Sequence, residues 1–287
     1  MEIKKICVAG GGRMGRQIGM CAAIYGVEVT VYDVIEAVLT DVDSWADEYL
    51  AGRVAKGRMT QEQVDAIRGR FHTAKTLEEA LKDVDCIVEC VLEKEEIKRD
   101  FFKKADALVD DHVIFATNSS YMVSSKFADC IKNPSKMCNM HFYNPALVMK
   151  FVEVVQGPHT SEDTAQSVYD LCLKMEKKPI WQKKEIPGFA GNYLIAGLYQ
   201  RARYLVENGY CTFEEVDIAM EYGFNHKMGP FRLNDLTGID LSYDIMNRFY
   251  QETGEKPIGF DQVKELYDKG WYGKKTGRGF YDYTEKK

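Results

Sequence analysis

The sequence has no apolar run long enough to cross a membrane and no surplus of basic residues. A membrane-spanning helix needs about 20 consecutive apolar residues, and the longest apolar stretches here are shorter. The 287 residues include 38 Lys and Arg against 44 Asp and Glu, a net charge of −6. That sign is wrong for a protein whose main task is to grip nucleic acid. We therefore expect no membrane or nucleic-acid partner, and a polyanionic ligand needs a local basic patch.

The eight cysteines form no C-x-x-C pair. Cys7, Cys86 and Cys90 lie inside apolar runs, where a thiol packs as a small hydrophobic side chain. We expect reduced cysteines that bind no metal, as in a cytoplasmic protein. The first residues lead into an apolar strand rather than into a signal peptide with a cleavage site, so we expect the mature protein to start here.

What is present is an ordinary globular composition, with 45% hydrophobic and 29% charged residues. The chain opens with strand, glycine turn, helix and strand: Gly10–Gly15 follows an apolar run, a helical pattern continues to Gly26, and residues 27–33 alternate as a second strand. This is a βαβ unit, the element of a parallel sheet. Further strands are expected at residues 85–91, 113–116, 137–141 and 151–155.

Beyond Pro187 the strand patterns disappear and helical patterns continue to about residue 270. We predict an α/β Rossmann-type fold with a doubly wound, mostly parallel sheet in residues 1–185, and an all-helical C-terminal domain in residues 186–287. The charged helical pattern of residues 35–70, broken at Lys56-Gly57, is predicted to form a helical insertion in the first domain.

The glycine turn has the spacing of a dinucleotide-binding motif. In Gly10-x-Gly12-x-x-Gly15, the first glycine permits a tight turn, the second lets the backbone approach a pyrophosphate, and the third lets helix and strand pack closely. Asp33 ends the second strand, where a carboxylate accepts hydrogen bonds from a ribose diol and repels a 2′-phosphate. The pattern predicts NAD rather than NADP. A structural glycine turn beside a solvated Asp is the alternative.

His141 and Glu153 are candidate acid/base residues. His141 stands at the end of an apolar strand, where open α/β sheets bind their ligands. Glu153 is the one carboxylate inside the apolar strand Phe151–Val155, and it needs a partner because an unpaired buried carboxylate is costly. An imidazole held by a carboxylate keeps one tautomer and is easier to protonate, as a group that takes and gives a proton must be. A structural histidine beside a strand-end glutamate gives the same pattern.

Other polar residues carry weaker signals. Asn118-Ser119-Ser120 follows a strand and has side chains that can bond a substrate carbonyl or a nicotinamide amide, as can those of any polar loop. Asn192 begins an apolar helix, where it is either a buried hydrogen-bonding residue or a solvated one. The remaining histidines are interpreted as surface or packing residues: His72, His112, His159 and His226.

Taken together, these motifs resemble the short-chain L-3-hydroxyacyl-CoA dehydrogenases, the group of 3-hydroxybutyryl-CoA dehydrogenase. The resemblance runs nearly end to end. Beyond the glycine turn it covers Ile87–Glu93, Asn118–Ser120, His141–Pro145, Met149–Val155, Pro187–Phe189, Asn225–Pro230 and Gly277–Tyr283. The His-to-Glu segment and the closing segment are specific signals, whereas the glycine turn occurs in many families.

The resemblance implies an NAD-dependent oxidoreductase that interconverts 3-hydroxyacyl-CoA and 3-ketoacyl-CoA, with short chains such as 3-hydroxybutyryl-CoA and acetoacetyl-CoA, in fatty acid metabolism. It assigns the general acid/base to His141, its orientation to Glu153, and substrate contacts to Ser120 and Asn192. Cofactor contacts are expected at Gly10, Gly12, Arg13, Met14, Gly15, Asp33, Glu93, Lys98 and Asn118. Contacts to coenzyme A are expected around Arg53 and Lys56, although a charged helix face is more often only solvated.

Three residues depart from the family pattern. Tyr121 stands where the family has Ser, Tyr193 replaces the Arg after Asn192, and Lys227 replaces a Pro. They bear on acyl-chain preference rather than on reaction type. Two alternatives remain: a sister NAD-dependent dehydrogenase of a free hydroxy acid, such as a sugar acid or carnitine, and a non-catalytic NAD-binding protein. The helical domain is expected to form a homodimer and to close the substrate cleft.

Overall fold

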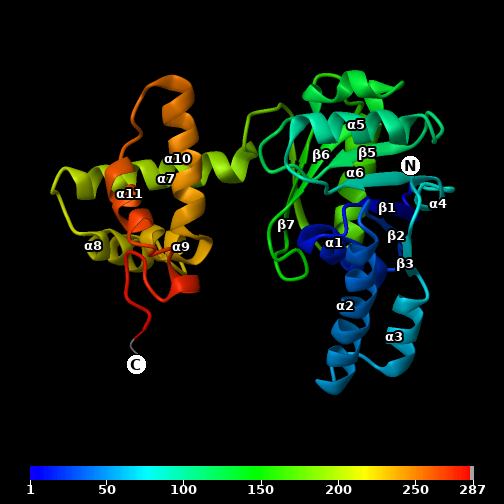
Figure 1. Ribbon diagram of the computed structural model, residues 1–287, viewed down its shortest axis with the longest axis horizontal. Helices are drawn as coiled ribbons and strands as arrows, with labels where there is room; N and C mark the ends of the chain where they lie inside the picture. The colour runs from blue at the N-terminus through cyan, green and yellow to red at the C-terminus, as the bar shows by residue number, and fades with distance from the viewer. Residues whose placement is uncertain (285–287) are drawn as a thin grey trace. The chain divides into compact units, whose positions relative to one another are not determined.

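The computed structural model describes residues 1–284 (Figure 1). The chain divides into two compact units, Met1–Ala190 and Gly191–Lys287. The first unit contains a sheet of eight strands: β1 (Lys5–Ala9), β2 (Glu28–Tyr32), β3 (Phe71–Ala74), β4 (Cys86–Glu89), β5 (Ile114–Thr117), β6 (Met137–Phe142), β7 (Phe151–Val155) and β8 (Lys178–Gln182). Their order is β3-β2-β1-β4-β5-β6-β7-β8, and every neighbouring pair is parallel except β6 and β7. The predicted mostly parallel sheet is confirmed.

Helices cover both faces of this sheet, as a doubly wound fold requires. They are α1 (Arg13–Ile24), α2 (Glu36–Ala55), α3 (Gln61–Arg68), α4 (Leu77–Ala80), α5 (Glu95–Asp106) and α6 (Glu162–Lys174), with 3₁₀ turns η1 (Ser124–Lys126), η2 (Ala128–Cys130) and η3 (Pro134–Lys136). On one face Met140 packs in a core with residues of α1, α2, α3 and α6, while on the other Phe115 packs with residues of α4 and α5.

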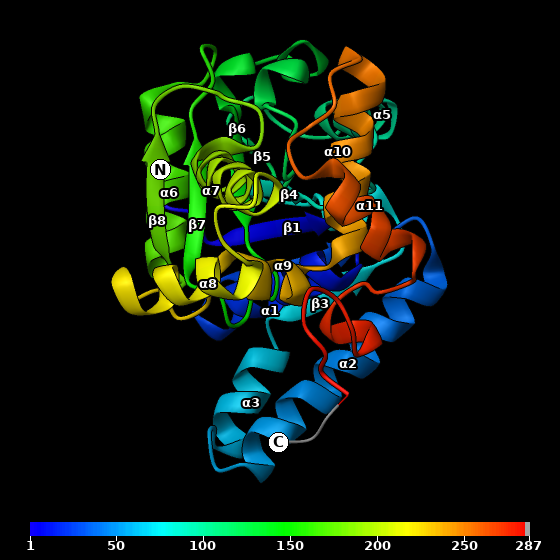
Figure 2. The same ribbon diagram turned by 90° about the vertical axis from the view of Figure 1, so that its left-hand side faces the viewer.

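Helices α2 and α3 form the helical pair expected between residues 35 and 70. Thr60 begins α3 with a capping box: its side chain accepts from the Gln63 backbone, and the Gln63 side chain accepts from the Thr60 backbone. The two helices pack side by side and extend away from the sheet (Figures 1 and 2). Lys56 is the C-cap of α2, at the end of that helix away from Asp33.

Two strands, β3 and β8, have no counterpart among the strands expected from the sequence. Strand β3 has only four residues, with buried Phe71 and Ala74 flanking more exposed side chains. Strand β8 is an edge strand whose last four residues, Pro179 among them, are half-exposed. Short or partly exposed strands lack the continuous apolar run that marks a central strand, so periodicity alone misses them.

The second unit is helical. Helix α7 (Phe189–Glu207) leads into it, followed by α8 (Phe213–Ile218), the π-helical turn η4 (Ala219–Gly223), α9 (Pro230–Thr237), α10 (Ile239–Thr253), α11 (Phe260–Asp268) and the 3₁₀ turn η5 (Lys274–Thr276). In residues 191–284, β pairing is limited to isolated bridges in the closing segment. The predicted helical C-terminal domain is confirmed.

Two buried carboxylates hold the closing segment of the second unit. Asp217 accepts hydrogen bonds from the Phe231 backbone (2.8 Å) and from the Tyr281 hydroxyl (2.8 Å). Asp235 accepts from the backbones of Phe280 and Tyr281, each at 2.9 Å. A Cβ at Gly279 would lie 2.0 Å from the Asp235 carboxylate, so only glycine fits there. The closing motif of the sequence, Gly277–Tyr283, thus has a structural role: hydrogen bonds to Asp217 and Asp235 fix it to the helical unit.

Candidate active site

The glycine turn between β1 and α1 has the close contacts that its spacing predicts. Gly10 has φ +105°, and a Cβ there would lie 2.4 Å from the carbonyl oxygen of Cys90. A Cβ on Gly15 would lie 1.8 Å from the Gly10 carbonyl oxygen, so helix and turn pack at a distance that excludes any other residue. Gly12 is exposed, and a Cβ there would meet no atom within 4 Å. Its backbone is therefore open to a ligand.

The N-terminus of α1 is suited to an anion. Gly12 is the N-cap residue and contributes no side-chain hydrogen bond, and the first turn carries no acidic residue. Exposed Arg13 and half-exposed Met14 open the helix. Backbone N–H groups at such an end, aligned with the helix dipole, attract a phosphate group. The turn thus fits the pyrophosphate of a dinucleotide.

Asp33 follows β2 beside this turn. One oxygen of its carboxylate accepts from the Gly11 backbone at 2.8 Å, and the other from the Ile35 backbone at 3.0 Å. Asp33 stays half-exposed, so its remaining lone pairs can accept from a ribose diol. Lys75 forms an ion pair with Glu36 next to this strand end. The sequence did not indicate this cation, because the two residues are far apart in the chain.

His141 and Glu153 face each other across β6 and β7. The antiparallel register pairs them directly, and His141 Nδ1 lies 2.8 Å from Glu153 Oε2. Because a carboxylate has no hydrogen to give, Nδ1 carries the proton and Nε2 is left as the nitrogen that exchanges one. His141 is 4% exposed and Glu153 is fully buried. A buried, hydrogen-bonded imidazole of this kind can act as an acid/base if a ligand reaches Nε2.

Aromatic rings and an amide hold the histidine in place. The rings of Tyr143 and Phe189 have centroids 4.8 Å and 5.5 Å from that of His141. The Asn118 side chain accepts from the Phe142 backbone at 2.9 Å, which ties the loop after β5 to the end of β6. The rings pack against the imidazole, and the amide contact brings Asn118, one of the predicted cofactor residues, to the residue that follows His141.

Lys98 and Glu93, two predicted cofactor contacts, belong to a buried network. The Lys98 ammonium lies 2.6 Å from Glu89 and 3.1 Å from Glu93, and Lys98 is only 1% exposed. Burial acts to lower the pKa of Lys98, but Glu89 and Glu93 outweigh it and raise that pKa, so the ammonium stays charged. Thr117 donates a further hydrogen bond to Glu89 at 2.6 Å. Glu93 is 47% exposed and is the member that faces solvent.

The same network positions the loop that carries Ser120. Glu93 accepts a hydrogen bond from the Ser119 hydroxyl and another from the Ser120 backbone, the latter at 3.2 Å. The Ser119 hydroxyl in turn accepts from the Met122 backbone at 2.9 Å. Lys98 therefore acts on this loop through Glu93. Sequence reasoning missed Glu89, although a lone carboxylate in the apolar strand β4 gives the same signal as Glu153 in β7.

The contacts within the first unit do not connect three predicted site residues to the glycine turn, to the His141–Glu153 pair or to the Lys98 network. Arg53 and Lys56 lie at the far end of α2, where Arg53 is half-buried against the Tyr49 ring at 5.9 Å and Lys56 is exposed. Asn192 belongs to the second unit, in the first turns of α7. Arg58, close to Lys56, lines a pocket of about 280 Å³ together with Arg70.

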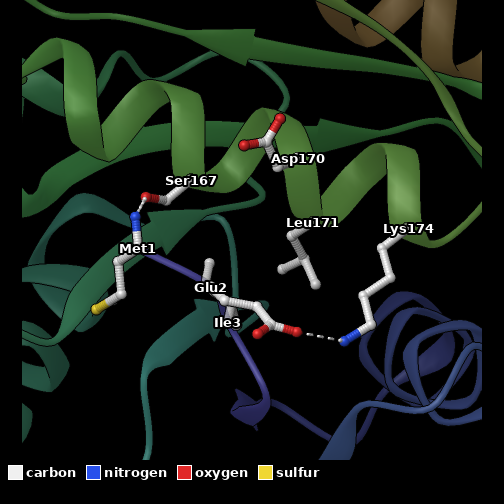
Figure 3. Close-up of a pocket in the computed structure, with 7 residues that line it drawn as sticks. All are labelled: Met1, Glu2, Ile3, Ser167, Asp170, Leu171 and Lys174. Atoms are coloured by element: carbon white, nitrogen blue, oxygen red, sulfur yellow. Dashed lines mark hydrogen bonds and ion pairs between the residues drawn. The ribbon is translucent and has the colours of Figure 1, made fainter.

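A larger cavity, of about 420 Å³, has no part in this site. It lies between the first residues of the chain and α6, where Ser167 accepts from the Met1 amine and Lys174 pairs with Glu2 (Figure 3). Helix α6 packs on the sheet face that holds Met140, whereas His141 points to the opposite face. Residues 1–284 contain no cluster of three His, Cys, Asp or Glu arranged for a metal, and no helix among them is long and apolar enough for a membrane.

The glycine turn, Asp33 and the buried imidazole–carboxylate pair belong to one sheet, an arrangement that fits an NAD-dependent dehydrogenase. Family models identify its type: residues 5–186 match the NAD-binding domain of 3-hydroxyacyl-CoA dehydrogenase, and residues 188–283 match the C-terminal domain. The chain belongs to the 3-hydroxyacyl-CoA dehydrogenase family.

Individual relatives agree with this assignment. The chain is 37% identical over 287 residues to a probable 3-hydroxybutyryl-CoA dehydrogenase of Bacillus subtilis, covering 100% of this chain and 99% of that protein. It is 32% identical to the human mitochondrial hydroxyacyl-coenzyme A dehydrogenase, covering 98% and 91%. Among solved structures, (S)-3-hydroxybutyryl-CoA dehydrogenase from Ralstonia eutropha matches with a TM-score of 0.89 and 29% identity, over 99% of this chain and 100% of that one.

Proposed function

We propose that this protein interconverts (S)-3-hydroxyacyl-CoA and 3-ketoacyl-CoA of short chain length, with His141 and Glu153 as its acid/base pair. The observation that carries the proposal is the 2.8 Å hydrogen bond between the two buried side chains, in the same unit as the NAD turn. The names of the relatives support 3-hydroxybutyryl-CoA and acetoacetyl-CoA as the substrate pair.

In the oxidising direction His141 Nε2 takes the proton of the substrate hydroxyl. NAD, when bound, would accept the hydride from the substrate carbon that bears this hydroxyl. Glu153 stabilises the imidazolium that forms, because its carboxylate already accepts from Nδ1. Ser120 and Asn192 donate hydrogen bonds to the substrate oxygen. In the reducing direction His141 returns the proton to that oxygen.

We assign cofactor binding to the first domain, and substrate binding and homodimer formation to the helical one. The helical domain exposes apolar side chains on α7, α8 and α10, including Leu194, Ile218 and Ile245, and contact with a second copy would bury such side chains. We further propose that coenzyme A is held around Arg53 and Lys56, and that the enzyme works in the cytoplasm. The basic pocket that Arg58 and Arg70 line lies close to these residues in the helical pair.

The substrate assignment is tested by following NADH consumption with acetoacetyl-CoA and, separately, with free acetoacetate. We expect turnover with the thioester and little with the free acid, because only the thioester offers the phosphates of coenzyme A to the helical pair. Comparable rates with both would favour the sister dehydrogenases of free hydroxy acids. No turnover with either, in protein that binds NADH, would favour a non-catalytic NAD-binding protein.

Lys56→Glu tests the coenzyme A contact. Reversing this exposed charge should raise KM for acetoacetyl-CoA, and more so at low salt, because screening weakens the interaction between exposed charges. Initial rates at two ionic strengths measure the effect. A KM that stays unchanged at low ionic strength would mean that Lys56 is only solvated and does not contact coenzyme A.

Asp33 should make NADH the preferred cofactor by at least about tenfold in kcat/KM over NADPH. The 2′-phosphate of NADPH would place a negative charge beside the Asp33 carboxylate and be repelled by it. Glu36 adds little to this repulsion, because it forms an ion pair with Lys75. Asp33→Ser should reduce the preference, chiefly by weakening NADH binding. Kinetics with both cofactors decide the matter, and equal efficiencies in the unmodified protein would mean that Asp33 does not face the ribose.

A further inference from the structure

Tyr143 brings a second hydrogen-bond donor to the carboxylate of the acid/base pair. Its hydroxyl lies 3.2 Å from Glu153 Oε2, the same oxygen that accepts from His141 Nδ1 at 2.8 Å. Two donors therefore share one carboxylate oxygen. The contact depends on the strand register, since Tyr143 follows β6 two residues after His141 and its side chain falls on the same face of the sheet.

Packing holds the Tyr143 ring in this orientation. Its centroid lies 5.2 Å from that of Phe151, which shares the Glu153 face of β7, and 4.8 Å from that of His141. Burial, together with the charge of Glu153 and the hydrogen bond to it, raises the pKa of Tyr143 far above its usual value. The hydroxyl thus remains a neutral donor throughout the pH range in which a histidine titrates.

Several elements near the pair place uncharged groups beside it. Strand β8 places apolar Ile180 opposite Glu153, α7 contributes Phe189 against the imidazole, and the loop after β5 contributes neutral Asn118. The ionisable groups that these contacts bring together are His141, Glu153 and Tyr143.

We propose that Tyr143 is a positioning residue that sets how strongly the His141–Glu153 pair holds its proton. A hydroxyl that donates to the carboxylate spreads its negative charge and leaves less of it for the imidazolium. Without the hydroxyl, more of that charge would face the imidazolium. Only the effect of Tyr143 on the reaction rests on the proposed function, because the hydrogen bonds to Glu153 are present without substrate.

Tyr143→Phe tests the proposal by removing the hydroxyl and keeping the ring. In protein labelled with [¹³C]histidine, and without substrate, the NMR titration midpoint of His141 should move upward by about half a pH unit. The signal is assigned by its loss in His141→Ala, which separates it from the other four histidines. Tyr25→Phe is the matched control: it also removes a tyrosine-to-glutamate hydrogen bond, to Glu176 at 3.0 Å, and should leave the midpoint in place.

A second arm removes the carboxylate. In a Glu153→Gln background, Tyr143→Phe should produce no further shift, because no shared charge remains. An equal shift in that background, or a midpoint in Tyr143→Phe that coincides with that of the unmodified protein, would overturn the proposal. Should Tyr143→Phe fail to fold, as judged by circular dichroism, Tyr143→Met removes the same hydroxyl and is read in the same way.

The reaction provides an independent readout. For reduction of acetoacetyl-CoA, which needs protonated His141, the basic limb of the pH profile should move upward in Tyr143→Phe by the amount measured by NMR. A limb that stays in place while the rate falls would assign Tyr143 a purely structural role and overturn the proposal. If the unmodified protein does not reduce acetoacetyl-CoA, the proposed function fails, but the NMR titration still decides the role of Tyr143.

Discussion

His141→Ala is expected to lower turnover by about 10²- to 10⁴-fold while leaving NADH affinity nearly unchanged. The substitution removes the proton acceptor of oxidation and the proton donor of reduction. It does not touch the glycine turn or Asp33, which follow strands β1 and β2 rather than β6. Steady-state kinetics with acetoacetyl-CoA and NADH titrations by fluorescence measure the two quantities separately.

Two further variants frame this result. His112→Ala, at an exposed histidine before β5, should leave turnover unchanged and serves as the matched control. Glu153→Gln should be impaired, because an amide cannot stabilise the imidazolium as a carboxylate does. Near-normal turnover in His141→Ala would show that the imidazole is structural and would remove the acid/base assignment.

Lys98→Met should destabilise the first domain by about 3–5 kcal/mol, the usual cost of removing one partner of a buried ion pair. The ammonium is 1% exposed and neutralises Glu89, which is fully buried, so its loss leaves a carboxylate in the core without its cation. Urea unfolding followed by circular dichroism measures the change. Activity should fall as well, because Glu93 loses the cation that holds it against the loop of Ser119 and Ser120.

Lys126→Met is the matched control for this effect. Lys126 pairs with Glu95 at 2.8 Å, but both side chains are nearly half-exposed. A pair in contact with water contributes less than about 1 kcal/mol, so its loss should barely change the unfolding midpoint. Equal destabilisation by the two variants would contradict the role of burial, and a stable Lys98→Met would show that Glu89 is protonated when alone.

The sequence predicts best where local pattern and geometry coincide. Gly10 and Gly15 occur where the turn tolerates no side chain, so their spacing alone locates it. The alternation of β7 places Glu153 on the face opposite Val152 and Val154, because strand side chains have a period of two whatever lies next to the strand. The same rule indicates Glu89, the one carboxylate in the buried strand β4.

What periodicity could not supply is the identity of neighbours across the sheet. Strand β7 runs antiparallel to β6, and the register that sets His141 opposite Glu153 also brings the Tyr143 hydroxyl to the same oxygen. No local signal distinguishes this arrangement from a parallel one, since both satisfy the same alternation. The burial of Lys98 depends in the same way on the packing of α5 against β4.

The amino-acid sequence by itself determined the α/β class, the dinucleotide turn, the helical pair and the two residues that carry the acid/base hypothesis. Those features follow from backbone sterics and from side-chain periodicity, which act over a few residues. Only the tertiary structure decided which polar groups share a charge: His141 and Tyr143 on Glu153, and Lys98 between Glu89 and Glu93. Such sharing requires atoms within about 3 Å, and folding alone brings residues distant in the chain that close.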